Sequence, residues 1–266
     1  MKIKSFHLLL ILAMASSVSC TKVAPAGPAG PQGATGPALT GVLQGFISHY
    51  DPSGAMITTD LAGVVVSIDE TAQTATTDVN GFYSFTGLTT GVYNLSIKPI
   101  TTTFNSVSAT YCPTKIQSIA FTGGGNTYRN TSISLAPTGS VSSMVTNANA
   151  SSIQISGVVS PVTSYNQEVI IYVGAPSSTT VDSSTTDFIS YYTTSVAANT
   201  SSYSISIPVS DFYNLGYPSG GVANAYFAAY LIGKNLMAST YADLTTNRAI
   251  YTAISANSIT STVLIP

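Results

Sequence analysis

Charged side chains are scarce in this sequence. Asp, Glu, Lys and Arg make up only 7% of its 266 residues, against roughly 25% in typical soluble proteins. The apolar share is ordinary at 44%, so Ser, Thr, Asn and Gly stand where charges would be. Thr packs well on pleated surfaces, and few charges means few i,i+4 ion pairs to support exposed helices. We therefore expect an all-β protein.

Basic residues are especially few. Lys2 and Lys4 lie at the very start, which leaves six basic against ten acidic residues, a net charge of −4, in the rest of the chain. Proteins that bind nucleic acid use a basic patch or stripe to neutralise phosphates, and this sequence has none. Nucleic acid is therefore not expected as a partner.

Cysteine and histidine are almost absent. The chain has two cysteines, and we expect Cys20 to carry a lipid. Cys112 then has no disulfide partner, and we expect it to pack as a small buried hydrophobe. One nearby cation, Lys115, is weak support for a reactive thiolate. His49 is the single histidine after the first 20 residues, and we expect it to be solvated at a strand end near Asp51 rather than to act as a catalytic base.

Carboxylates are not arranged for catalysis either. Asp69 and Glu70 are adjacent, so on a strand they point to opposite faces. The glycines at 123–125 are not followed by the Lys-Ser/Thr start of a phosphate-binding helix. We therefore assign no catalytic residue and no cofactor, and an enzyme of unrecognised type is the least favoured alternative.

Calcium is the best metal hypothesis for this chain. It needs roughly six to eight oxygen ligands, and Asp78 and Asn80 could supply two. No Asp-x-Asp-x-Asp run is present to supply the others, so this site is only a weak candidate.

The N-terminus has the order of an export signal. Lys2 and Lys4 precede an apolar run at 8–15 and small residues at 16–19, and Cys20 follows. The run is shorter than the roughly 20 residues of a membrane-spanning helix. We predict a signal peptide at 1–19 and lipid attachment at Cys20, as in bacterial lipoproteins. The usual Leu three places before the cysteine is Ser17 here, so a plain secretory signal is the alternative.

A collagen-like linker is predicted at 20–40. Residues 27–38 form four Gly-X-Y triplets, which resemble collagen. Four triplets are too few for a stable triple helix, so trimerisation is the lesser alternative. An extended spacer rising about 3.1 Å per residue would span on the order of 55 Å.

Alternating strand patterns begin at residue 41. The expected strands are 41–50, 63–68, 71–78, 82–85, 92–97, 115–121 and 128–135. Asn80-Gly81 supplies a tight turn between two of them. These proportions predict a first β-sandwich at 41–136.

Three runs in this region resemble a known family. TTDVNGFYSF at 76–85, with GVVVSI at 63–68 before it and GVYNL at 91–95 after it, is similar to the carboxypeptidase regulatory-like family, a transthyretin-type sandwich. It also resembles the B-type repeats of bacterial collagen adhesins. The resemblance implies a non-catalytic spacer or binding module. Some adhesin domains join a lysine to an asparagine, but the strand at 41–50 has no lysine, so we expect no isopeptide bond.

A second β-sandwich is predicted at 137–266, after a Pro/Gly boundary at 136–140. Its expected strands are 152–159, 168–174, 187–196, 203–209, 223–232, 248–254 and 258–265. In the strand at 223–232, Tyr226, Ala228, Tyr230 and Ile232 share one face. The pattern resembles a fibronectin type III or immunoglobulin-like domain.

Tyrosine is the main functional hint. The chain has 16 Tyr and no Trp, and exposed Tyr is a common contact residue in protein and glycan recognition. Phe212, Tyr213 and Tyr217 lie in a Pro/Gly-rich segment and are our candidate binding loop. The alternative is that Tyr replaces Phe in half-exposed strands.

The combination of signal, spacer and Thr-rich sandwiches resembles envelope lipoproteins of Bacteroidetes-type bacteria. We predict a lipid-anchored, non-enzymatic module of the outer membrane that acts in binding, adhesion or structure. The alternative is an accessory subunit of an outer-membrane transport or secretion complex. Because Thr21-Lys22-Val23, not acidic residues, follow Cys20, the choice between the cell surface and the periplasmic face stays open.

Overall fold

The computed structural model describes residues 36, 38–104, 107–183, 188–234, 240–244 and 246–266. The predicted signal peptide, Cys20 and nearly all of the linker lie outside these residues. All elements below belong to the unit formed by residues 38–266. In the described part of the chain, no helix has the length and apolar character needed to cross a membrane.

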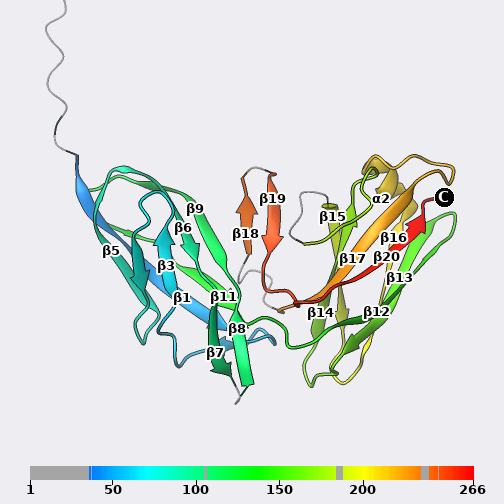
Figure 1. The fold of residues 1–266 in the computed structure, drawn as a ribbon, viewed down its shortest axis with the longest axis horizontal. Coiled ribbons are helices and arrows are strands. Elements are labelled where there is room, and N and C mark those ends of the chain that lie inside the picture. The colour runs from blue at the N-terminus through cyan, green and yellow to red at the C-terminus, as the bar shows by residue number, and fades with distance from the viewer. Residues whose placement is uncertain (1–35, 37, 105–106, 184–187, 235–239, 245) are drawn as a thin grey trace, which may run out of the picture. The chain divides into compact units, whose positions relative to one another are not determined.

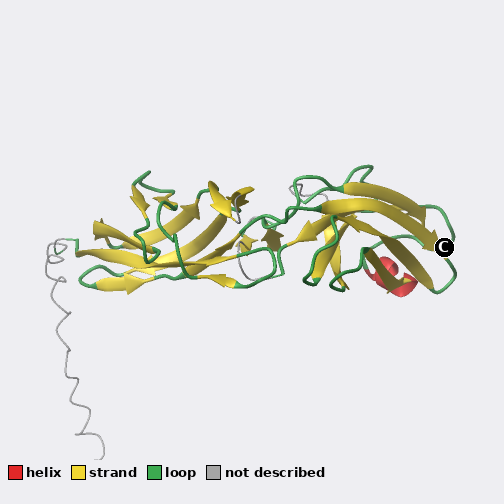
Figure 2. Cartoon of the chain, turned by 90° about the horizontal axis from the view of Figure 1, so that it is seen from below, coloured by secondary structure: helices red, strands yellow, loops and turns green. Residues whose placement is uncertain are grey.

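The prediction of an all-β fold is confirmed. Figure 2 shows strands throughout the described residues and one short helix. The strands of the first half are β1 (Thr40–Tyr50), β2 (Met56–Ile57), β3 (Val65–Ile68), β4 (Thr74–Thr76), β5 (Phe82–Thr89), β6 (Gly91–Ile97), β7 (Ile100–Phe104), β8 (Val107–Tyr111), β9 (Thr114–Phe121), β10 (Asn126–Tyr128) and β11 (Thr131–Ser134). The elements of the second half are β12 (Ser140–Ala148), β13 (Ser152–Ser160), β14 (Gln167–Gly174), β15 (Phe188–Val196), β16 (Ser202–Pro208), α2 (Val209–Asn214), β17 (Asn224–Ile232), β18 (Thr240–Asp243), β19 (Arg248–Tyr251) and β20 (Ile259–Leu264).

The first half is a sandwich organised around β1. This strand pairs antiparallel with β5 and β2 and parallel with β10 and β11. The opposing sheet has the order β4-β3-β6-β9, and β7 and β8 form a separate hairpin (Figure 1). Leu43 and Ile47 of β1 point into the core between the sheets, so the alternation of a strand directs Gln44 and Phe46 to the outer face.

The second half is also a sandwich, with sheet orders β12-β13-β16 and β15-β14-β17-β20 (Figure 1). Strand β17 is apolar on both faces. Its inner face adds Phe227 and Leu231 to the main core, while Tyr230 and Ile232 join a second, outer cluster. Side chains of the hairpin β18–β19 pack against this outer cluster. They cover the outer face of β17, so this strand is buried on both faces.

Several expected strands differ in their bounds. The strand expected at 128–135 is two strands, β10 and β11, which are interrupted at Arg129 and Asn130 where β1 changes partner. The Thr-rich strand expected at 71–78 is limited to the three residues of β4. Strand β12 and the hairpin β7–β8 were not predicted. The domain limits at 136/137 stay a prediction, although the main core residues run from Leu43 to Leu135 in one half and from Val141 to Ile265 in the other.

Candidate functional site

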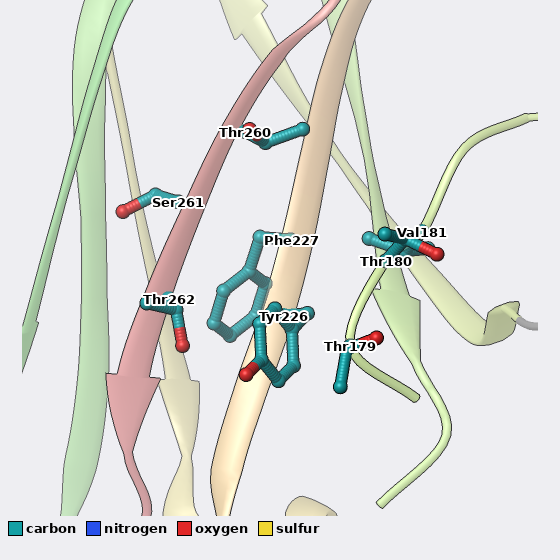
Figure 3. Close-up of a pocket in the computed structure, with 8 residues that line it drawn as sticks. All are labelled: Thr179, Thr180, Val181, Tyr226, Phe227, Thr260, Ser261 and Thr262. Atoms are coloured by element: carbon teal, nitrogen blue, oxygen red, sulfur yellow. The ribbon is translucent and has the colours of Figure 1, made fainter. Parts of the chain in front are cut away.

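A groove of about 300 Å³ lies on the outer face of the second sandwich, beside β17 and β20 (Figure 3). We call it the threonine groove. It is lined by Thr179, Thr180, Val181, Tyr226, Phe227, Thr260, Ser261 and Thr262. None of these side chains is charged, and six of the eight carry a hydroxyl group.

Strand pairing brings the sheet side of the groove together. Tyr226 of β17 is paired with Thr262 of β20, and Ala228 is paired with Thr260. Paired residues on one face of an antiparallel sheet have Cβ atoms about 5 Å apart. Tyr226, Thr260 and Thr262 therefore stand close together on the sheet wall of the groove.

The opposite wall is a loop that folds back over the sheet. Val181 is 5% exposed and packs into the outer cluster, which anchors the segment after β14. The backbone N–H of Ser183 donates a hydrogen bond to the hydroxyl of Tyr230 (3.3 Å). These two attachments hold Thr179 and Thr180 beside Tyr226, as Figure 3 shows.

Hydroxyl groups in the groove are available to a ligand. The side-chain hydroxyls of Thr179, Thr180, Tyr226, Thr260 and Thr262 make no hydrogen bond to another described residue. In contrast, the Ser261 hydroxyl lies 2.9 Å from that of Thr146 on β12 and points away from Tyr226 (Figure 3). The groove thus offers several uncharged donors and acceptors next to one aromatic ring.

A group of tyrosines continues along the same face. Tyr191 and Tyr251 share a hydrogen bond between their hydroxyls (2.8 Å), and the ring of Tyr172 lies 5.9 Å from that of Tyr230. Burial raises the pKa of Tyr172, and burial together with the hydrogen bond to Tyr191 raises the pKa of Tyr251. Tyr172 and Tyr251 therefore stay protonated and neutral at physiological pH, so neither adds charge to this face.

The predicted binding loop is only partly at the surface. Phe212 is fully buried against Phe227, and Tyr217 is buried with its hydroxyl donating to the Gly174 carbonyl (2.6 Å). Both rings belong to the main core. Phe212 lies on helix α2, which forms where a loop was expected, and Tyr217 follows that helix. Of the three predicted residues, only Tyr213 is exposed, at 41%, so the binding role stays a prediction for that residue alone.

Asp78 holds a turn. One carboxylate oxygen accepts hydrogen bonds from the backbone N–H of Phe82 (2.9 Å) and of Asn80 (2.8 Å). These bonds to the ionised form lower the pKa of Asp78. Within the described ranges no group of three or more His, Cys, Asp or Glu side chains comes together as metal ligands, and calcium at Asp78 and Asn80 stays an untested candidate.

His49 is not solvated, contrary to our prediction. Its ring is fully buried and packs at a tilt against Tyr111, with ring centroids 4.5 Å apart, and neither nitrogen has a hydrogen-bond partner among the described residues. At this point β1 pairs with β2 on one side and with β11 on the other, so the end of the strand is covered. Burial lowers the pKa of His49 to about 4.

The prediction for Cys112 is confirmed. Its side chain is buried, and burial raises the pKa of the thiol to about 12. A thiolate is therefore strongly disfavoured near neutral pH.

Most of the residues that line the threonine groove were not predicted from the sequence. The strand at 223–232 was expected to be buried with Tyr226 on one face, and this is confirmed. Thr179, Thr260 and Thr262 were not singled out, because Thr is common throughout the chain and the pairing of β17 with β20 has no local sequence signal.

No family model matches the chain, and no characterised protein matches it in sequence. Among solved structures, it is similar to a DUF3823 family protein from Parabacteroides merdae, with 13% identity over 82% of this chain and 98% of the other and a TM-score of 0.30. It is also similar to a Bacteroides uniformis protein provisionally named as carbohydrate binding, with 15% identity over 85% of this chain and 100% of the other and a TM-score of 0.29. The major pilin SpaD of Corynebacterium diphtheriae is 10% identical over 83% of this chain and 65% of the pilin, with a TM-score of 0.24. What this chain binds is therefore inferred from its own side chains.

Proposed function

We propose that this chain is a lipid-anchored, non-enzymatic binding module of the bacterial envelope whose threonine groove holds an uncharged glycan. The observation that supports the glycan is the set of hydroxyls beside the ring of Tyr226 that make no hydrogen bond to another described residue. A sugar ring presents C–H groups that pack on an aromatic face and hydroxyls that exchange hydrogen bonds with Thr. Ligand sites commonly combine such apolar area with a few convergent polar groups.

The burial of His49 and Cys112 supports a non-enzymatic role. His49 is sealed in the core, and the Cys112 thiol is buried with its pKa raised to about 12. A general base or nucleophile must reach its substrate within hydrogen-bonding distance. Neither side chain can do so in this fold.

We further propose that a lipid attached to Cys20 holds the chain in the bacterial envelope. A lipid anchor with more than one acyl chain would hold the module durably, because each buried methylene contributes about 0.8 kcal/mol. Either membrane face is compatible with this proposal.

The groove is tested by calorimetric titration of the mature chain with four neutral hexasaccharides, of the cellulose, amylose, xylan and mannan types. We expect at least one to bind, with affinity unchanged between about 50 and 500 mM salt because the groove is uncharged. Tyr226→Ala should weaken binding at least tenfold, and Thr262→Val should weaken it less.

The matched control is Thr76→Val, the same change at an exposed position of β4 in another sheet. It should leave affinity unchanged. If no hexasaccharide binds, or if Tyr226→Ala binds as tightly as the natural chain, the groove is not a glycan site.

A further inference from the structure

Three aromatic rings and one amide gather on the outer face of the first sandwich, far in sequence from the threonine groove. Phe46 of β1 is paired with Phe82 of β5, and their ring centroids are 5.2 Å apart. Gln44 of β1 is paired with Tyr128 of β10 on its other side. Phe46 is 43% exposed and Tyr128 is 55% exposed, so this face presents aromatic surface to solvent.

The amide of Gln44 is unusual in this setting. The residue is only 9% exposed, yet its side chain makes no hydrogen bond to any described residue. Unlike the nitrogens of His49, its amide atoms keep some contact with solvent. A nearly buried amide without a partner costs free energy, because its hydrogen bonds to water are partly lost and not replaced. Such a group is more readily explained if a ligand completes its hydrogen bonds.

We propose that Gln44, Phe46, Phe82 and Tyr128 form a second binding site, for one sugar residue of a neutral glycan. We call these four residues the Gln44 platform. The rings pack against the C–H face of the sugar, and the Gln44 amide donates one hydrogen bond and accepts another from neighbouring hydroxyls. The site is separate from the threonine groove and does not depend on it.

The strand pairing argues against a peptide in this place. Extended peptides usually bind by adding a strand to a free sheet edge. Strand β1 is central, with β5 on one edge and β10 and β11 on the other. A peptide therefore cannot add to β1 itself, and recognition by Gln44 and Phe46 uses their side chains.

Charge and size also favour a sugar residue. The platform contains no charged group, and the nearby Arg129 directs a guanidinium nitrogen to the Tyr128 carbonyl (2.8 Å). A stable contact with a second copy of the chain needs about 800 Å² from each partner, much more than four side chains provide. A single ring of a neutral polysaccharide is the occupant that matches the rings, the amide and the small area.

Two sites on one chain would let a polysaccharide bind more tightly than a short oligosaccharide that reaches one site, because the second contact becomes intramolecular. This gain requires that the glycan be long enough to occupy both sites.

The test follows the side-chain NH₂ signals of Gln44 in nuclear magnetic resonance spectra of the mature chain, with the four hexasaccharides as probes. The Gln44→Met spectrum identifies these signals. We expect one hexasaccharide to shift them, and Phe46→Ala to weaken that interaction at least tenfold. Tyr226→Ala should leave it unchanged.

Gln44→Met separates binding from folding. It keeps the side-chain volume and removes an amide that has no hydrogen-bond partner among the described residues, so its unfolding midpoint in urea should equal or exceed that of the natural chain. Calorimetric affinity at this site should nevertheless fall at least tenfold.

Three results would overturn the second site. One is the absence of any shift at Gln44 with all four probes, the second is a shift that persists in Phe46→Ala, and the third is an affinity at this site that is unchanged in Gln44→Met. If a hexasaccharide shifts the signals of the threonine groove but not those of Gln44, the second site is refuted and the proposed function stands. If Gln44 shifts and the groove signals do not, the groove is refuted as a glycan site and the Gln44 platform stands.

Discussion

At the scale of single residues, both sandwiches contain a glycine paired across two strands with a tyrosine whose hydroxyl binds a nearby backbone carbonyl. In the first, Gly45 of β1 is paired with Tyr83, whose hydroxyl donates to the Arg129 carbonyl (2.5 Å). A Cβ on Gly45 would overlap that carbonyl. The missing side chain thus lets the segment between β10 and β11 come close to β1, and the tyrosine hydroxyl provides a hydrogen bond to the carbonyl there.

The second sandwich repeats the arrangement on unrelated strands. Gly157 of β13 is paired with Tyr203, whose hydroxyl donates to the Ser143 carbonyl (3.2 Å) next to a register shift in β12. Burial raises the pKa of Tyr203 to about 12, so the phenol remains a donor. A Cβ on Gly157 would again overlap the carbonyl.

We predict that Gly157→Ala destabilises the chain by about 3 kcal/mol, because backbone must move to admit the methyl group. Tyr203→Phe should cost about 1 kcal/mol through the lost hydrogen bond. Tyr213→Phe is the control, since its hydroxyl bonds the Pro266 carbonyl at an exposed site, and should change stability by less than about 0.5 kcal/mol. Urea unfolding measures all three, and equal losses for Tyr203→Phe and Tyr213→Phe would contradict this view.

His49 makes stability depend on pH. In the unfolded chain its ring takes up a proton near the ordinary pKa of 6.5, whereas burial lowers the folded pKa to about 4. Between these values the unfolded state binds more protons, so stability is complete above pH 6.5 and falls as the pH drops toward 4. The loss from this residue should reach about 3 kcal/mol.

The measurement is urea unfolding from pH 8 to pH 4, compared with His49→Phe, which keeps a ring against Tyr111 and removes the proton. The natural chain should lose about 3 kcal/mol of stability relative to His49→Phe as the pH falls through this window. A constant difference would mean that the ring is accessible to protons in the folded state.

At the scale of elements, the sequence predicted strands with strong alternation and missed those defined by distant partners. The strands at 41–50 and 223–232 were found because apolar residues alternate or run continuously through them. Strand β12 was missed because its register with β13 shifts partway, which breaks the alternation. The platform and the groove were missed for a related reason: both depend on which strands become neighbours.

Helix α2 shows where local reasoning failed. The aromatic residues of a Pro/Gly-rich segment were expected in a surface loop, but Val209 and Phe212, three residues apart, share the buried side of a one-turn helix. That spacing was the signal available in the sequence, although one turn is too short for it to be recognised with certainty.

We predict that Phe212→Ala costs about 3–5 kcal/mol, because it leaves a cavity between α2 and β17. The neighbouring Tyr213→Ala should cost less than about 1 kcal/mol, since that ring is 41% exposed. Thermal and urea unfolding of the two variants measure the contrast. Similar small losses would place Phe212 at the surface and restore it as a candidate contact residue.

At the scale of the whole molecule, the chain provides its own control for lipid attachment, because it has two cysteines in different settings. Cys112 is buried with its pKa raised to about 12, whereas Cys20 follows the predicted signal peptide. Growth of the producing cells with a labelled fatty acid should label the natural chain and Cys112→Ser equally. Cys20→Ser should be unlabelled and should leave the membrane fraction, because a polypeptide without its acyl chains loses the apolar contact that holds it there. Label retained in Cys20→Ser would show that the anchor lies elsewhere, and an unlabelled natural chain would favour the plain secretory signal that Ser17 leaves open.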